Sequence, residues 1–158
     1  MLIQDLLSVL ARRLGTGELV LDANNLCCIQ VDTLEMNVEF VEQQKYLFVY
    51  ISVGVVSARQ HGSFLMDVLS ANLFYHGTNR EAAFSLDHAT SELMLFQRFN
   101  ITSIDEAIFV EHCVQLIEVA KKWQTTFHIY NAEKSITPHQ QSHQRLTLNG
   151  KGEINEHF

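Results

Sequence analysis

The chain has 158 residues, of which 47% are hydrophobic and 18% are charged, a composition typical of one folded domain and not of a disordered chain. Its 18 acidic and 11 basic side chains give a formal net charge of -7, which disfavours binding to nucleic acid or to an anionic membrane surface. No apolar run approaches the roughly 18 residues that a membrane-spanning helix needs.

The first predicted elements are a helix over residues 2–14 and a short strand over residues 19–21. Apolar residues recur in the helix at steps of three and four, and Gly15 is placed to end it. The start lacks the basic segment followed by an apolar segment that marks a secretory signal, so we expect a cytoplasmic protein.

Three further strands are predicted over residues 26–31, 34–41 and 46–53. The strand over residues 34–41 alternates apolar and polar side chains, which indicates one buried face and one face in water. The strand over residues 46–53 is apolar on both faces, and so is the later stretch 93–96. Strands of that kind must be covered on both faces.

The second half of the chain predicts a helix over residues 63–73, a strand over 82–86, the strand that contains 93–96, and a long final helix. Ser103 and Glu106 have the spacing of a capping box at the start of that helix. The final helix carries a wide apolar stripe formed by Phe109, Cys113, Leu116, Ala120, Trp123, Phe127 and Tyr130. Beyond the stripe the sequence becomes polar, so we expect a domain over residues 1–131 and a polar, flexible tail over 132–158.

The element order therefore predicts an α+β fold with a mostly antiparallel sheet: helix, three or four strands, helix, two strands, helix. We expect the three helices to cover one face of the sheet. They cannot readily cover both faces, so the strands that are apolar on both sides leave apolar surface for a partner. The pattern predicts association, without indicating with what.

Motifs that carry catalysis are missing from the sequence. It has no phosphate-binding loop, no dinucleotide fingerprint, no nucleophile elbow and no zinc-protease motif, so we expect no enzymatic activity and no cofactor. His139 and His143 are four residues apart in the polar tail, without nearby cysteines or clustered carboxylates, and we expect no metal site there. The adjacent Cys27 and Cys28 are expected to point to opposite faces of a strand as reduced packing residues, and Cys113 to lie in the core.

Several segments resemble one family in the same order and spacing. Residues 14–27, Leu-Gly-Thr-Gly-Glu-Leu-Val-Leu-Asp-Ala-Asn-Asn-Leu-Cys, resemble the opening of the class I type III secretion chaperones, the Tir-chaperone (CesT-like) family. Residues 69–74, Leu-Ser-Ala-Asn-Leu-Phe, are similar to its Leu-x-Ala-Asn-Leu-aromatic signature, and residues 83–87 and 93–99 resemble its last hairpin. The resemblance covers roughly residues 2–130. It departs at Gly54, which is not followed by the proline that members often have.

This resemblance implies a cytoplasmic homodimer without enzymatic activity. Such a protein binds the N-terminal chaperone-binding region of one or more secreted effectors, keeps it unfolded and secretion-competent, and helps deliver it to the export apparatus and its ATPase. The alternative is a dimeric regulatory module that sequesters a transcription regulator of the secretion system. The third hypothesis is an enzyme or a protein that binds a small ligand.

Candidate contact residues follow from the elements that match the family. For effector binding we select apolar candidates expected to be exposed on the first helix and the two-faced strands: Leu7, Leu10, Phe48, Tyr50, Leu93 and Leu95. For the dimer interface, which the resemblance places around the second helix, we select Leu65, Val68, Leu69 and Leu73. Each of these residues could instead belong to the ordinary core.

Overall fold

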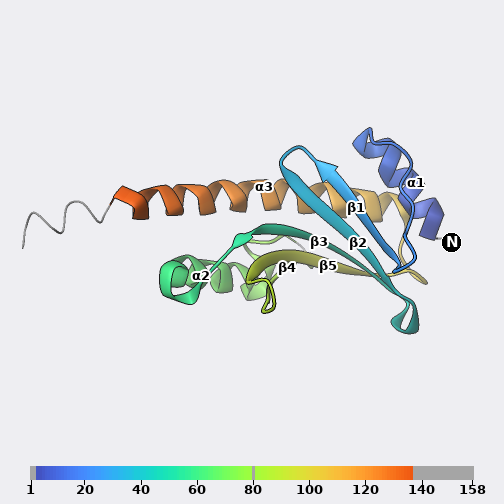
Figure 1. Ribbon diagram of the computed structural model, residues 1–158. Coiled ribbons are helices and arrows are strands. Elements are labelled where there is room, and N and C mark those ends of the chain that lie inside the picture. The colour runs from blue at the N-terminus through green and yellow to red at the C-terminus, as the bar shows by residue number, and fades with distance from the viewer. Residues whose placement is uncertain (1–2, 80, 137–158) are drawn as a thin grey trace, which may run out of the picture. The chain divides into compact units, whose positions relative to one another are not determined.

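The computed structural model describes residues 3–79 and 81–136, which form three α-helices and five strands (Figure 1). The elements in chain order are α1 (Ile3–Leu14), β1 (Leu26–Val31), β2 (Leu34–Val41), η1 (Glu42–Gln44), β3 (Tyr46–Val55), α2 (Ala58–Asn72), η2 (Leu73–Tyr75), β4 (Ala83–Asp87), β5 (Glu92–Asn100) and α3 (Glu106–Ile136). A first compact unit of the chain ends at Phe127, and the last turns of α3, from His128, belong to a second unit.

The sheet has the strand order β1-β2-β3-β5-β4, and every neighbouring pair is antiparallel. This confirms the predicted α+β class and mostly antiparallel sheet. The predicted strand over residues 19–21 is wrong, because that segment forms no ladder. Leu19 is buried instead, and its carbonyl accepts a hydrogen bond from the Gln4 side chain of α1 at 2.9 Å. The Asp22 carboxylate accepts from the backbone N–H groups of Asn24 and Leu26, which holds the turn into β1.

The α2 helix begins at Ala58, earlier than the predicted start at Ser63. The Ser57 hydroxyl accepts a hydrogen bond from the Gln60 N–H and caps the helix. At His61 the backbone leaves the helical region, with φ -118° and ψ 20°, so the helix is kinked near its start. The His61 imidazole Nδ1 accepts from the Ser57 N–H at 2.9 Å, which ties the kink to the cap.

The capping box predicted from Ser103 and Glu106 is wrong. The residue that caps α3 is Asp105, whose carboxylate accepts from the N–H groups of Ala107 at 2.9 Å and Ile108 at 3.2 Å. The helix then continues to Ile136, past the expected domain boundary at residue 131, and the rest of the expected tail lies outside the described residues.

The core lies between the sheet and the helices on one of its faces (Figure 1). Its largest fully buried side chains include Leu6, Leu7 and Leu10 from α1, Leu47 and Ile51 from β3, and Phe109 and Leu116 from α3. The α2 helix packs Phe64 against Trp123 and Phe127 of α3, with ring centroids 6.0 and 5.0 Å apart. The apolar stripe predicted for α1, and that predicted for α3 as far as Phe127, are therefore confirmed as faces that pack inward.

Candidate protein-binding surfaces

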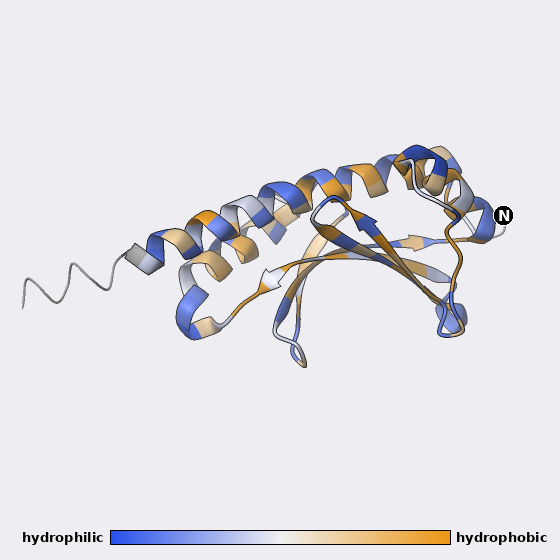
Figure 2. Ribbon diagram, turned by 45° about the horizontal axis from the view of Figure 1, so that its top comes forward, coloured by the Kyte–Doolittle hydropathy of each residue, from blue (hydrophilic) through white to orange (hydrophobic). Residues whose placement is uncertain are grey.

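Figure 2 shows α1 and α3 on one side of the sheet. The opposite face carries an apolar strip of side chains from β3 and β5 that are only half-buried in the described chain. Strand alternation places Phe48 and Tyr50 of β3 on this face, together with Met94 and Phe96 of β5, and all four are half-buried. Tyr50 pairs with Phe96 in the β3–β5 ladder, so these two side chains are cross-strand neighbours. The strip lines an open groove of about 330 Å³, here called the sheet groove, formed by Glu39, Phe48, Tyr50, Ser85, Asp87, Met94 and Phe96.

The border of the sheet groove is acidic. The Tyr50 hydroxyl donates a hydrogen bond to the Glu39 carboxylate at 3.3 Å, and Asp87 lines the groove from β4. Burial and then the negative charge of Glu39 raise the pKa of Tyr50 to about 12, so its hydroxyl keeps the proton that it donates to Glu39 well into the alkaline range. A segment that fills this groove would therefore meet aromatic rings in the middle and carboxylates at the edge.

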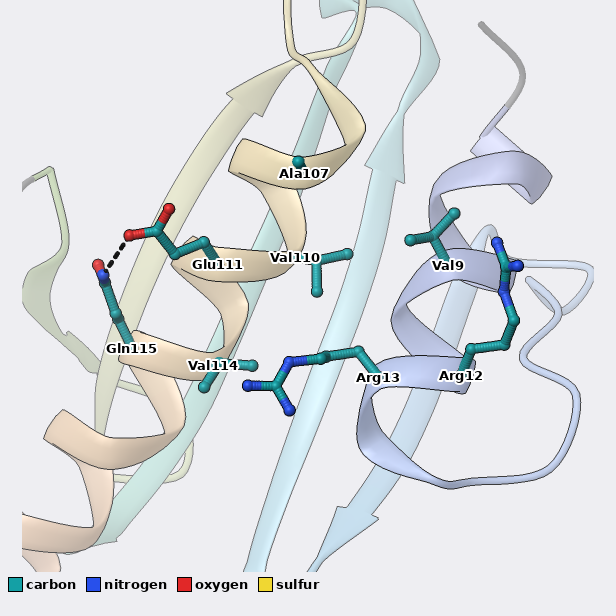
Figure 3. Close-up of a pocket in the computed structure, with 8 residues that line it drawn as sticks. All are labelled: Val9, Arg12, Arg13, Ala107, Val110, Glu111, Val114 and Gln115. Carbon is teal, nitrogen blue, oxygen red and sulfur yellow. Dashed lines mark hydrogen bonds between the residues drawn. The ribbon is translucent and has the colours of Figure 1, made fainter.

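A second groove, here called the helix groove, lies between α1 and α3 (Figure 3). Its volume is about 680 Å³, and its lining residues are Val9, Arg12, Arg13, Ala107, Val110, Glu111, Val114 and Gln115. The three valines form an apolar floor, since Val110 is buried and the other two are half-buried. Two arginines stand on the α1 wall, and the Glu111 carboxylate on the α3 wall accepts a hydrogen bond from Gln115 at 2.9 Å.

A third surface is the outer side of α2 together with η2. Here Met66, Leu69 and Leu73 are exposed at helical spacing, and the ring of Phe74 is 78% exposed. We call these four residues the α2 patch. Phe74 also has a positive φ of 51°, which is uncommon for a bulky residue. Contiguous exposed apolar residues of this kind mark interaction sites in soluble proteins.

Four of the six candidate effector-contact residues are core residues, so their expected exposure is wrong. Leu7 and Leu10 form the inner stripe of α1 and are fully buried. Leu93 and Leu95 are also buried, because they lie on the face of β5 that points toward the helices. Phe48 and Tyr50, in contrast, line the sheet groove.

Among the candidate dimer residues, Leu69 and Leu73 are exposed and Leu65 is half-buried. Val68 is 2% exposed and belongs to the core, because it follows Phe64 by one helical turn on the inner side of α2. The sequence reasoning missed Met66, although Leu69 one turn later on the same side of α2 had been selected, and it missed Phe74, which directly follows the selected Leu73.

The sequence reasoning also missed Met94 and Phe96. Strand alternation puts these two residues on the face of Arg98, which is exposed, and it puts Leu93 and Leu95 on the face of Gln97, which is buried. Gln97 and Arg98 are both polar, so the only sequence signal for the correct face was the charge of Arg98, since arginine is rarely buried. The two arginines of the helix groove had no such signal, because the groove joins segments far apart in the sequence.

The described residues offer little for chemistry. They contain no group of three or more His, Cys, Asp or Glu residues that could hold a metal ion. Burial raises the pKa of the Cys113 thiol, and likewise that of Cys27 and Cys28, which disfavours the reactive thiolate form. Cys27 is buried and Cys28 exposed, as predicted for neighbours on a strand. A search of the described helices finds none with the length and apolar character needed to cross a membrane.

The chain is similar to known proteins both in sequence and in fold. The model of the Tir chaperone protein (CesT) family matches residues 5–124. No curated protein matches the sequence significantly. Similar solved structures include the HopA1-SchA chaperone-effector complex. The match covers 78% of this chain and 93% of the matched chain, with 17% sequence identity and a TM-score of 0.62.

Two further structures are similar to a comparable degree. The ExsC-ExsE complex matches with 19% identity over 78% of this chain and 91% of that chain, with a TM-score of 0.64. The Yersinia pestis type III secretion chaperone SycH, in complex with a stable fragment of YscM2, matches with 19% identity over 77% of this chain and 99% of that chain, with a TM-score of 0.59. The TM-scores of these three matches show a shared fold. Because the family model also spans most of the sequence, the chain belongs to the Tir chaperone protein (CesT) family.

Proposed function

We propose that this protein is a cytoplasmic chaperone that binds the N-terminal chaperone-binding region of one or more type III secretion effectors. The observation that carries the proposal is the sheet groove, an uncovered apolar strip on a fold whose family consists of chaperones. Structures with this fold include a chaperone-effector complex and a type III secretion chaperone bound to a protein fragment. In this proposal the chaperone keeps the bound segment unfolded and helps deliver it to the export apparatus and its ATPase.

The geometry suits an unfolded client. Ordering a flexible segment on binding carries an entropy cost, which such segments offset by spreading over a large surface. The sheet groove and the helix groove each offer apolar surface, and they involve different elements of the fold. The outer strands β1 and β4 also have one edge without a strand neighbour in the sheet, and an extended chain can pair with such an edge.

The proposal includes a homodimer formed through the α2 patch. Met66, Leu69 and Leu73 are exposed at helical spacing along α2 and its end, and the next residue, Phe74 of η2, is exposed as well. A patch on a single helix can meet its own copy across a twofold axis, which is the commonest symmetry of soluble homo-oligomers. Removing these side chains from water provides the free energy for association.

The test is a pull-down of the tagged protein from its native cytosol with secretion switched off, followed by mass spectrometry. The Phe48→Asp variant is run beside the wild type, because a charge in the sheet groove should release the client while the fold stays intact. Gln43→Asp provides the control, since Gln43 is exposed on η1 and also gains one negative charge.

We expect one or a few exported proteins that the wild type and the control retain and that Phe48→Asp loses. Retention should map to the N-terminal region of the exported protein when fragments are co-expressed. Capture of a transcription regulator without any exported protein would instead favour the regulatory module, and an unchanged client in Phe48→Asp would remove the sheet groove from the proposal.

A further inference from the structure

We infer that the helix groove binds an acidic amphipathic segment of the client, in which Asp or Glu side chains are interspersed with apolar ones. This inference rests on the proposed function and specifies the chemistry of one part of the client. It concerns a surface formed by α1 and the first turns of α3, separate from the residues that line the sheet groove.

The floor of the groove accepts apolar side chains. Val9, Val110 and Val114 are compact residues from two facing helices, and they leave an open volume of about 680 Å³. That volume lies within the range of about 300–1,000 Å³ that is typical of ligand pockets. Figure 3 shows Val110 of α3 and Val9 of α1 on opposite sides of the groove. Larger apolar side chains of a partner can therefore enter between the helices.

The α1 wall supplies positive charge. Arg12 and Arg13 are both exposed, and within residues 3–79 and 81–136 neither guanidinium has an ion pair or side-chain hydrogen bond. Figure 3 shows the Arg13 side chain extending from α1 toward Val114 of α3. A guanidinium binds a carboxylate through two parallel hydrogen bonds, which gives both affinity and orientation. The partner best suited to this wall carries carboxylates.

The charge of the rest of the molecule makes this arrangement informative. The net charge of -7 attracts basic peptides and repels acidic ones at long range. The sheet groove repeats that preference, since Glu39 and Asp87 line it. A preference for an acidic segment must therefore come from a local excess of cations beside apolar surface. The helix groove provides one, because two arginines, Arg12 and Arg13, face a single carboxylate, Glu111, which already accepts a hydrogen bond from Gln115.

Arg12 and Arg13 also lie in the last turn of α1, where cations interact favourably with the helix dipole. That role stabilises the fold and is independent of any partner. The two roles differ in what they predict, because the dipole role affects the thermal midpoint alone, whereas the docking role affects the affinity for acidic peptides.

The test uses fluorescence anisotropy on the full-length protein with two labelled probe peptides. Both contain the same leucines at helical spacing, and the remaining positions are mainly glutamate in one peptide and mainly lysine in the other. The double variant Arg12→Gln/Arg13→Gln is compared with Arg59→Gln/Lys122→Gln, which removes the same charge from exposed positions on α2 and α3 outside the groove.

We expect Arg12→Gln/Arg13→Gln to weaken binding of the glutamate peptide by about tenfold or more, because two charge-assisted contacts are lost. The control double variant should leave that affinity nearly unchanged, and added salt should weaken it in the wild type. The lysine peptide should respond to Phe48→Asp and not to the arginine variant. Thermal melts of both double variants show whether α1 remains folded.

An equal loss in the two double variants would overturn the inference, because it would indicate long-range charge alone. Loss of the glutamate peptide in Phe48→Asp only would also overturn it, by placing the peptide in the sheet groove. A change of oligomeric mass in Arg12→Gln/Arg13→Gln would assign the helix groove to a second copy of the chain. If the peptide results are as expected but no exported client is found, the groove's preference stands and the proposed function fails.

Discussion

Gly54 of β3 lies directly beneath the ring of Phe127 in α3. A Cβ atom added at Gly54 would overlap Phe127 Cε1, because it would lie closer to that atom than real Cβ atoms come to any neighbour. The ladder between β3 and β5 also shifts its register between Ser52 and Gly54, so the strand is irregular at this point. The missing side chain thus allows α3 to pack closely on the end of the central strand.

Substituting Gly54→Ala should therefore destabilise the protein. The new methyl group requires the Phe127 ring or the strand to move, and overpacking of this kind costs about 1–3 kcal/mol. The measurement is the free energy of unfolding from a denaturant titration.

The matched control is Gly62→Ala in α2. Nothing lies within 4 Å of a Cβ atom at Gly62, and alanine is a better helix former there by about 0.5–1 kcal/mol. Equal stability of the Gly54→Ala variant and the wild type would mean that Phe127 adjusts freely, and the close packing would then carry little energy.

Local patterns predicted most of the fold. The alternation of β2 and the apolar stripe of α3 each identify an element and its buried face without reference to the rest of the chain. The strand predicted over residues 19–21 was wrong because a short apolar run does not distinguish a strand from a buried loop. The start of α2 was predicted too late because Gly62 and the kink at His61 interrupt the helical pattern there.

The candidate sites depend on information that is less local. Phe48 and Tyr50 could be found because the paired strand β2 shows polar residues on the same face. In β5, residues 93–96 are all apolar, and the two polar residues that follow, Gln97 and Arg98, lie on opposite faces. Only the charge of Arg98 favours the face that is open. The helix groove forms where α1 meets α3, and no pattern within either helix indicates that contact.

A charge on the open face of the sheet and a charge on its buried face should have opposite effects on folding and on client binding. Phe48→Asp places a charge on the open face, where the side chain is half-buried, and should leave the fold intact while client binding is lost. Leu95→Asp places a charge at a position with no exposed surface and should unfold the protein, since burying an unpaired carboxylate costs several kcal/mol. Circular dichroism and client binding are measured on both variants, and a folded Leu95→Asp protein would contradict the assignment of the two faces.

The N-cap of α3 predicts a contrast between two neighbouring residues. Asp105→Ala removes the acceptor of two backbone N–H groups and should cost about 1 kcal/mol, within a range of roughly 0.5–2. Ser103→Ala should change stability little, because the exposed Ser103 hydroxyl does not cap the helix. A larger loss in Ser103→Ala than in Asp105→Ala, measured by thermal unfolding, would restore the capping box that the sequence suggested.

The raised pKa of Tyr50 makes stability depend on pH in the alkaline range. Its folded-state pKa is about 12 against an unfolded value near 10, so the folded state holds this proton more tightly. The resulting stabilisation is fully present below about pH 10 and is lost as the pH rises through the folded pKa. We expect the denaturant concentration at the unfolding midpoint to decrease as the pH rises from about 10 to about 12. The decrease should be less steep in Tyr50→Phe, because phenylalanine has no proton to lose. Identical slopes would show that other groups dominate.

The α2 patch predicts a dimer that single charges can dissociate. Leu69 is 63% exposed in the monomer, so Leu69→Asp should leave the fold intact and oppose the approach of a second copy. The control is Val20→Asp, because Val20 is 55% exposed in the loop before β1, away from α2. Sedimentation equilibrium should give a dimer mass for the wild type and for Val20→Asp, and a monomer mass for Leu69→Asp. A wild-type monomer, or a Leu69→Asp dimer of unchanged affinity, would exclude the patch as the dimer interface, and the exposed Phe74 ring would then need another partner.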